Sequence, residues 1–560
     1  MNNAQSYMKE VLQVEQVEER PSGIHGILHT SDYAEFTIVD DMGKEIHRFT
    51  GAKLANKCLP GDHVSWNDGC VLELRSEHCL LVGTIAITSK IRYGITSRGV
   101  PIYLFVPYNK SYPNFIVGCS TKDLSRNIIG VLTFDDWKKN STFPRGNLQE
   151  IVGPSGDRDA EYQALIWQVC PLKWSKGTYQ IKQEPTNRVG ITGFTYNIDP
   201  KGCKDIDDVF TFKKMGENYW KIYISISDVA SYIVNNSAED IIASLIGQTI
   251  YDNEGRVLRP MLPVEYSEGV CSLQPDRVSS GISLCFEWNG VEIKNKRWLE
   301  TSFINRQSFS YEEFQEWDSE YKEVLAKIVS HLAQRDVTDS HEWVEQMMIL
   351  YNKEAGKWLK ESKMGILRRH SAPDWERLEK YKQHIPELMN MAFSSAEYCL
   401  AEEENTQHYG LDSDHYAHAS SPIRRYADLV NQRVLKILIR QSKEGFIVPQ
   451  AMLDMNQREK SIKRFARDLQ FLQAIQHPME CKGIILDRTA INDTEYKIRL
   501  YIPDWKKTLS TTYKKQSEHT VLSRDEKEEI DVSEFREVIV HYAFHMNVAN
   551  WKERIIINIR

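Results

Sequence analysis

Short apolar runs separated by turn residues occupy both ends of the chain. Examples are the runs at residues 34–39, 102–107, 128–134, 484–486 and 496–502. Short strands at such close spacing are typical of small β-barrels. We therefore predict barrels at residues 23–82, 83–178 and 479–560, preceded by a polar, acidic arm over residues 1–22.

The middle of the chain has a mixed pattern. Strand-like apolar runs cover residues 191–198, 209–212 and 219–224. Helical periodicity of apolar residues then covers residues 321–359, 385–401 and 452–475. Strands followed by helices predict one mixed α/β domain over residues 179–478. The expected fold class is therefore multidomain α+β.

The composition is that of an ordinary globular protein, with 41% hydrophobic and 26% charged residues. No apolar run is long enough for a membrane span, so we expect none. The ten cysteines are scattered without C-x-x-C pairs, which argues against a zinc site and against disulfides and favours a reducing compartment. We expect the cytoplasm and leave a nuclear or organellar location open.

The most informative polar cluster is an acidic loop between two strand-like runs. It holds Asp199, Asp205, Asp207 and Asp208 within ten residues. Carboxylates this close raise one another's pKa values unless cations share their charge. Hard oxygen ligands suit Mg²⁺ or Mn²⁺, and paired ions of this kind cleave phosphodiesters. The alternative is a set of Asx-turns around the proline and glycine of this loop.

A second segment adds basic side chains. Ser421 is a good N-cap and Pro422 suits the first helical position, so we predict that a helix begins here. Arg424 and Arg425 then fall in the first turn, where free N–H groups already favour an anion such as phosphate. Arginine can grip a phosphate bidentately. The alternative is that one or both arginines pair with a carboxylate such as Asp428.

Together these segments resemble a known family. The acidic loop resembles the T-I-D-P-x-x-A-K-D-x-D-D motif of the RNB nuclease domain, the catalytic unit of the ribonuclease II and ribonuclease R family. The segment from Ser421 resembles that family's S-P-I-R-R-Y-x-D-L motif. Further matches occur in the family's order, at residues 260–263, 271–273, 310–313, 344–348 and 368–373.

The resemblance implies an architecture and an activity. The architecture is two N-terminal cold-shock-like OB barrels, a central mixed α/β RNB domain and a C-terminal OB barrel. The activity is processive 3′–5′ hydrolysis of single-stranded RNA to nucleoside 5′-monophosphates with Mg²⁺. We expect a monomer whose recruiting partners are unknown. The net charge of −8 counts against broad attraction to RNA but not against a local basic channel.

The resemblance also implies roles for single residues. The expected metal ligands are Asp199, Asp205, Asp207 and Asp208. Arg424 would clamp the scissile phosphate, with Arg425 beside it. Tyr251 would stack on a base, and Tyr311 with Glu345 would contact ribose. In the barrels, Tyr93, Tyr103 and Tyr108 are candidates for base stacking, with core packing as the alternative.

Three positions depart from the family's motifs. Ser225 replaces a histidine, Gln432 precedes Arg433 where the family has a histidine, and Ala466 replaces an acidic residue. Two alternative functions remain open. One is a catalytically weak or inactive RNA-binding protein on an RNB fold, which should show as lost aspartates. The other is a nuclease for single-stranded DNA, which Tyr311 and Glu345 argue against.

Overall fold

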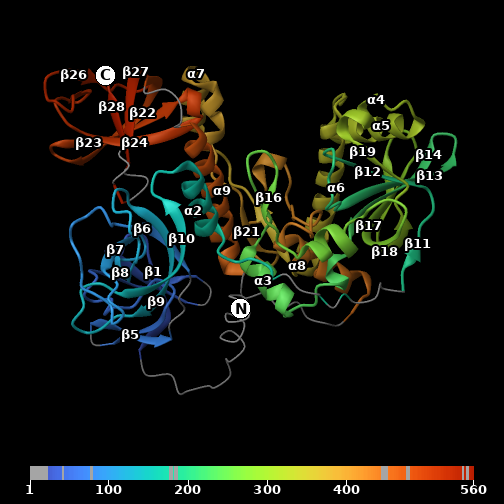
Figure 1. Ribbon diagram of the computed structural model, residues 1–560. Coiled ribbons are helices and arrows are strands. Elements are labelled where there is room, and N and C mark those ends of the chain that lie inside the picture. The colour runs from blue at the N-terminus through green and yellow to red at the C-terminus, as the bar shows by residue number, and fades with distance from the viewer. Residues whose placement is uncertain are drawn as a thin grey trace. The chain divides into compact units, whose positions relative to one another are not determined.

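The computed structural model describes residues 23–40, 43–67, 69–75, 80–175, 179, 181, 187–442, 452–474, 480–544, 548–549 and 554–560. The chain divides into two compact units. One is built on residues 172–460, and the other on residues 14–171 together with 461–560 (Figure 1).

The N-terminal part of the second unit consists of two small β-domains. The first is a five-stranded sheet in the order β3-β2-β1-β4-β5. Its strands are β1 (Ile24–Thr30), β2 (Glu35–Val39), β3 (Glu45–Thr50), β4 (His63–Asn67) and β5 (Cys70–Arg75). The second is a closed barrel in the order β10-β8-β7-β6-β9. It comprises β6 (Leu81–Ile85), β7 (Ile102–Pro107), β8 (Phe115–Gly118), β9 (Ile128–Asp136) and β10 (Arg145–Pro154), followed by α2 (Arg158–Val169).

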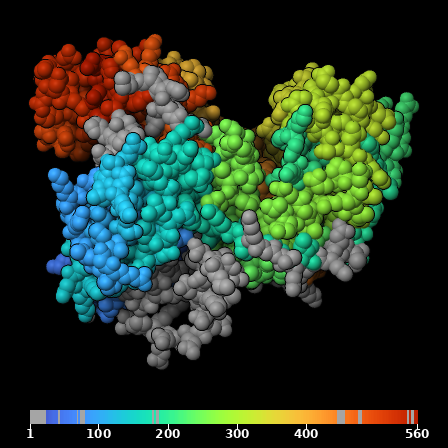
Figure 2. Space-filling view, viewed as in Figure 1, coloured from blue at the N-terminus to red at the C-terminus, as the bar shows by residue number. Residues whose placement is uncertain are grey.

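Both domains place alternate strand residues in an apolar core. Leu28, Phe36 and Ile38 fill the first, and Phe105 and Phe115 fill the second. Figure 2 shows the blue to cyan side chains of these strands as one packed body. Tyr103 and Tyr108 are buried (Tyr103 2% exposed), which confirms core packing for them, whereas Tyr93 is exposed.

The C-terminal domain is another five-stranded sheet, in the order β24-β23-β22-β27-β28. Its strands are β22 (Glu480–Asn492), β23 (Glu495–Ile502), β24 (Lys507–Lys514), β27 (Glu537–Phe544) and β28 (Ile555–Ile559), with the hairpin β25 (Thr520–Leu522) and β26 (Glu529–Asp531) beside them. Arg554, which directly precedes β28, is fully buried. It pairs with Glu161 of α2 and donates to Thr84 of β6 at 3.1 Å. A paired buried arginine therefore holds the end of the chain against the second barrel.

The other unit is built on a seven-stranded sheet in the order β11-β18-β17-β14-β13-β12-β19. Its strands are β11 (Val189–Gly190), β12 (Phe194–Asp199), β13 (Asp208–Gly216), β14 (Tyr219–Ser227), β17 (Val278–Trp288), β18 (Ile293–Ile304) and β19 (Gln307–Ser310). Two short hairpins accompany it, β15 (Ile250–Tyr251) with β16 (Val257–Arg259) and β20 (Ile366–Arg369) with β21 (Glu397–Leu400). The helices are α3 (Ala238–Ile246), α4 (Tyr311–Glu316), α5 (Glu320–Ala333), α6 (Ser340–Ser362), α7 (Trp375–His384) and α8 (Tyr426–Ile439). The chain passes from this unit to the other within α9 (Met452–Ala474).

Sheet and helices share one large core. Aromatic residues of β12 and β13, such as Tyr196 and Phe212, pack with apolar residues of α5, α6 and α8. Buried strands with helices against them are the mixed α/β arrangement expected for this region. The predicted fold class of OB-type β-domains flanking a mixed α/β domain is confirmed.

One predicted helix is wrong. Residues 385–401 do not form a helix, because α7 ends at His384 and Pro386 starts only a short 3₁₀ segment. A residue before proline avoids the helical region, and Ile385 has φ −146° and ψ 76°. The chain then enters β21, whose backbone pairs with β20 between Arg368 and Tyr398.

Two further observations concern the described residues. No helix among them is both long enough and apolar enough to cross a membrane. Their cysteines are all free thiols.

A buried histidine in the β20–β21 region gives a testable pH dependence. Burial lowers the pKa of His408 to about 4, and the neighbouring His370 adds to this effect. Because the pKa is lower in the folded protein than in the unfolded chain, stability is retained at neutral pH and lost as the pH falls from about 6.5 to about 4. We expect the free energy of unfolding in urea to fall by roughly 1 kcal/mol between pH 7 and pH 5 from this residue, after allowing for partial screening. An unchanged pH slope in His408→Gln would contradict this assignment.

Candidate active site

Strand pairing explains why the acidic loop and Tyr311 meet. β12 ends at Asp199 and β13 begins at Asp208, and the two strands pair antiparallel, so their connecting loop emerges at one edge of the sheet. β19 runs parallel to β12 with Asp199 opposite Ser310. The first residue of α4, Tyr311, therefore follows at that same edge. The side chain of Ser310 accepts from the N–H of Glu313 in a capping box, which fixes the start of α4.

Asp207 connects the loop to a distant part of the chain. Its Oδ1 accepts a hydrogen bond from the backbone N–H of Ile423 at 3.0 Å. Its Oδ2 lies 3.3 Å from Nε of Arg424. The backbone carbonyl of Asp207 accepts from the N–H of Ser227 at 2.8 Å, so the last residue of β14 holds it from the other side. The structure thus brings the acidic loop and the arginine segment together.

The start of helix α8 was predicted wrongly. The helix begins at Tyr426, not at Ser421, and the preceding residues form a turn in which the N–H of Arg425 donates to the carbonyl of Ser421 at 2.9 Å. The reason is Arg425, whose backbone is extended (φ −133°, ψ 127°) and forms a β-bridge with Gln248. The N–H of Ser421 donates to Oδ1 of Asp428 at 2.8 Å, and no side chain caps the start of α8.

The two arginines differ in their surroundings. Arg425 pairs with Asp428 at 2.8 Å and its side chain is 21% exposed. Arg424 is 44% exposed and pairs with Asp207 at the longer distance given above. The ion-pair alternative therefore holds for both arginines, with Asp428 as the partner of Arg425 and Asp207 as the partner of Arg424. Contact of Arg425 with RNA stays a prediction. Arg424 is the arginine that can reach an incoming phosphate.

The surroundings of the aspartates disfavour the charged form of their carboxyl groups. Burial raises the pKa of Asp207 to about 7, although Arg424 opposes the shift. Burial, together with Asp199 and Asp207, raises the pKa of Asp208 well above its usual range. Burial also raises the pKa of Asp199, and Asp205 adds to this. Arg424 lowers the pKa of all three carboxyl groups but does not offset the effect of burial, so the cluster carries too little positive charge.

The donor set fits a hard divalent cation. All its donors are carboxylate oxygens, as Mg²⁺ and Mn²⁺ prefer. Oδ2 of Asp208 is buried and has no hydrogen-bond partner among the described residues. Within the same part of the chain, no three His, Cys, Asp or Glu side chains already stand close enough together to hold an ion. The fit therefore rests on the chemistry of the donors and on this orphaned oxygen.

Tyr251 and Tyr311 lie near the aspartates. Burial raises the pKa of Tyr251, and Asp205 adds to the effect. Burial raises the pKa of Tyr311 to about 12, with Asp199 as the next cause. Glu345 is exposed on α6. The structure thus brings both tyrosines into electrostatic range of the acidic loop and places Glu345 on the helix that packs beside Tyr311.

Comparison with known proteins decides the family. A model described as the RNB domain matches residues 191–324 and 318–441. A model described as the Dis3-like cold-shock domain 2 matches residues 102–169. Residues 191–441 are an RNB domain. Relatives of this chain include proteins named ribonuclease R and exosome complex exonuclease RRP44, and the resemblance inferred from the sequence motifs is confirmed.

Among relatives, ribonuclease R of Buchnera aphidicola subsp. Schizaphis graminum is 26% identical over 518 residues, covering 75% of this chain and 69% of the relative. The structure of Mycoplasma genitalium RNase R in complex with ribose methylated single-stranded RNA matches with a TM-score of 0.68 at 17% identity, over 96% of this chain and 100% of that one. Yeast Ssd1, described as a pseudonuclease, matches with a TM-score of 0.61 at 15% identity, over 96% and 82%. At these identities the structural matches are likenesses of fold.

Sequence reasoning missed two residues of the RNB site. Asn197 donates to Oδ2 of Asp199 at 2.8 Å and itself accepts from Asn305, so a buried amide pair orients this carboxylate. His341 stacks on the ring of Tyr311 with centroids 3.8 Å apart and an interplanar angle of 9°. An asparagine inside a buried apolar strand was a usable signal for Asn197. His341 had none, because its contact depends on how α4 and α6 pack.

Of the three departures from the RNB motifs, the two in the same unit as the aspartates do not touch them directly. Ser225 shares a hydrogen bond with Ser283 at 2.6 Å inside the sheet. Gln432 donates to the carbonyl of Ser227 at 2.7 Å and accepts from the N–H of Ala230 at 2.9 Å. Ala466 is exposed on α9. Gln432 thus acts on the site only through Ser227, whose N–H holds Asp207.

Proposed function

We propose that this protein is a 3′–5′ exoribonuclease that degrades single-stranded RNA processively to nucleoside 5′-monophosphates. The observation that carries the proposal is the convergence of a buried aspartate cluster and Arg424 at one edge of the RNB sheet. The shortage of positive charge around Asp199, Asp207 and Asp208 supports a site built to bind divalent cations.

Each side chain has a proposed task. Asp199, Asp205, Asp207 and Asp208 would hold two Mg²⁺ ions, which Mn²⁺ can replace. Bound in such a site, these ions supply an activated water and stabilise the leaving oxygen. Arg424 clamps the scissile phosphate and stabilises the charge that develops on it. Asn197 keeps Asp199 oriented, and Asp207 holds the Ile423–Arg424 backbone in place.

RNA is the proposed substrate because of the residues around Tyr311. Tyr251 offers a ring for a base near the 3′ end. Tyr311 and Glu345 would contact ribose, whose 2′-hydroxyl separates RNA from DNA. The stack of His341 on Tyr311 supports this role, since it fixes the orientation of the ring.

Sugar recognition gives a prediction with chimeric strands. An RNA carrying deoxyriboses only at its 3′ end should be degraded more slowly until those sugars are removed. Each lost hydrogen bond costs roughly 1–3 kcal/mol, which is about ten- to a hundredfold in rate. Single-turnover rates on the two strands measure the difference. Equal rates would show that Tyr311 and Glu345 do not read the sugar.

A second candidate is an inactive RNA-binding protein. The fold match with yeast Ssd1, a pseudonuclease, favours it. Retention of the whole aspartate cluster and of Arg424 argues against it. Product analysis separates the two: labelled RNA incubated with Mg²⁺ should yield nucleoside 5′-monophosphates on thin-layer chromatography and should yield none when EDTA is present. RNA that is bound but left intact would support the inactive candidate.

A further inference from the structure

One face of helix α8 holds the segment of chain that follows strand β14. Gln432 of α8 is fully buried. Its Nε2 donates to the carbonyl of Ser227 at 2.7 Å, and its Oε1 accepts from the N–H of Ala230 at 2.9 Å. One turn further along α8, Lys436 pairs with Asp228 at 2.8 Å. Helix α8 therefore holds this segment through its backbone and through a side chain.

Ser227 connects the segment to the acidic loop. It is the last residue of β14 and is buried. Its N–H donates to the carbonyl of Asp207 at 2.8 Å, and its hydroxyl donates to the carbonyl of Cys271. Since Gln432 donates to the carbonyl of Ser227, each polar group of this serine has a partner. The backbone of Asp207 is thus held by α8 through Ser227.

The side chain of Asp207 connects back to the start of α8. Its Oδ1 accepts from the N–H of Ile423 at 3.0 Å, and its Oδ2 lies 3.3 Å from Nε of Arg424. These two residues lead into α8, whose Gln432 holds Ser227 and thereby Asp207 again. The contacts form a closed ring, and displacement of one member of such a network affects the others.

We propose that Gln432 is a positioning residue that sets the place of Asp207 relative to Arg424. This role rests on the proposed exoribonuclease function, in which Asp207 holds a metal ion and Arg424 clamps the phosphate. Both hydrogen bonds of Gln432 go to backbone groups, so the residue acts through Ser227. Its effect can be large, because a displacement of about 1 Å at a catalytic group can cost about a hundredfold in rate.

Gln432→Met tests this role in the full chain. Methionine is similar in length, but it cannot donate to Ser227 and accepts only weakly. The pair of Lys436 with Asp228 keeps the segment on α8 in this variant. In the absence of RNA, Mn²⁺ should bind about three- to tenfold more weakly than to the wild type. The electron paramagnetic resonance signal of free Mn²⁺ measures this binding without any reaction.

The rate and the RNA affinity of Gln432→Met should separate. At saturating Mg²⁺, the single-turnover rate on single-stranded RNA should fall at least about tenfold, because the reacting groups are misplaced. The dissociation constant of the same RNA in EDTA should stay within about twofold of the wild type, since RNA binds mainly through backbone and stacking contacts elsewhere. A general loss of folded protein would instead lower metal binding, RNA binding and rate together.

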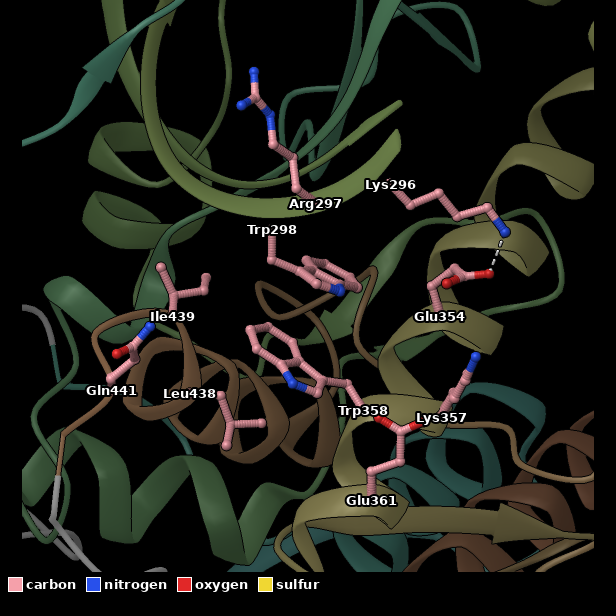
Figure 3. Close-up of a pocket in the computed structure, with 10 residues that line it drawn as sticks. All are labelled: Lys296, Arg297, Trp298, Glu354, Lys357, Trp358, Glu361, Leu438, Ile439 and Gln441. Atoms are coloured by element: carbon pink, nitrogen blue, oxygen red, sulfur yellow. Dashed lines mark hydrogen bonds and ion pairs between the residues drawn. The ribbon is translucent and has the colours of Figure 1, made fainter. Parts of the chain in front are cut away.

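Leu438→Ala is a matched control on the same helix. Leu438 lies about 9 Å further along α8 than Gln432, at the usual rise per residue, and packs against the core of this unit. Figure 3 shows its side chain at the cavity lined by Trp298 and Trp358, near the end of α8. The truncation should lower the free energy of unfolding but leave Mn²⁺ binding and the rate within about twofold of the wild type.

A second variant decides the outcome if Gln432→Met does not fold. The amide of Gln432→Asn stays polar but is one methylene too short to reach Ser227 and Ala230 together. The positioning role is overturned if the folded variant binds Mn²⁺ as tightly as the wild type, or if Leu438→Ala weakens Mn²⁺ binding as much. A wild type that binds Mn²⁺ but cleaves no RNA would overturn the proposed exoribonuclease function instead, and the Mn²⁺ comparison would still decide the role of Gln432.

Discussion

Replacing Asp208 with asparagine should abolish RNA hydrolysis and leave RNA affinity within a few-fold of the wild type. Asp208 carries the buried oxygen that has no partner among the described residues, so its proposed task is to bind a cation. Metal ions supply several kcal/mol of catalysis, and we expect turnover at saturating Mg²⁺ to fall by at least about a thousandfold. Most RNA binding comes from backbone and stacking contacts elsewhere.

The same substitution should raise the midpoint of thermal unfolding in EDTA. Burial and the neighbouring aspartates disfavour a charged Asp208, and asparagine removes that charge without changing the size of the side chain. Asp208 is a better test than Asp207, because Asp207 also anchors the N–H of Ile423. Retention of more than about a tenth of wild-type turnover by Asp208→Asn would be incompatible with a metal ligand, since such a loss equals only about 1.4 kcal/mol.

Arg424→Lys and Arg425→Lys should lose different properties, the first its catalytic rate and the second its stability. Arg424→Lys should lose most of its single-turnover rate and little stability, because a point charge does not replace a bidentate fork at the phosphate. Arg425→Lys should lose stability first, because Arg425 is largely buried against Asp428 and a lysine there leaves part of that carboxylate unpaired. Single-turnover rates and urea unfolding of both variants measure the contrast. If both variants lose the same rate and keep the same stability, the two arginines do not have the different roles assigned to them here.

Much of the fold could be predicted from the sequence because its strands are short and regularly spaced. Alternating burial in β2, where Phe36 and Ile38 are buried, is already visible in the apolar pattern. The start of α8 could not be predicted in the same way. Ser421 and Pro422 satisfy the local rules for a helix start, but the backbone of Arg425 is extended and pairs with Gln248, which is far away in the sequence, so the helix starts at Tyr426.

The active site likewise contains residues that could be predicted from the sequence and contacts that could not. Its aspartates could be predicted because four of them share one loop, and Arg424 because it lies inside a recognisable motif that begins at Ser421. The stack of His341 on Tyr311 could not. It joins residues that are far apart in the sequence, and their contact depends on how α4 and α6 pack.

One gel tests the central claim, that the RNB site of this chain degrades RNA from its 3′ end. Single-stranded RNA labelled at its 5′ end is incubated with Mg²⁺ and either the wild type or Asp208→Asn, and the products are separated under denaturing conditions. We expect the wild type to shorten the strand in one-nucleotide steps from the 3′ end and the variant to leave it intact. Internal fragments, an intact strand with the wild type, or equal degradation by both proteins would contradict the account.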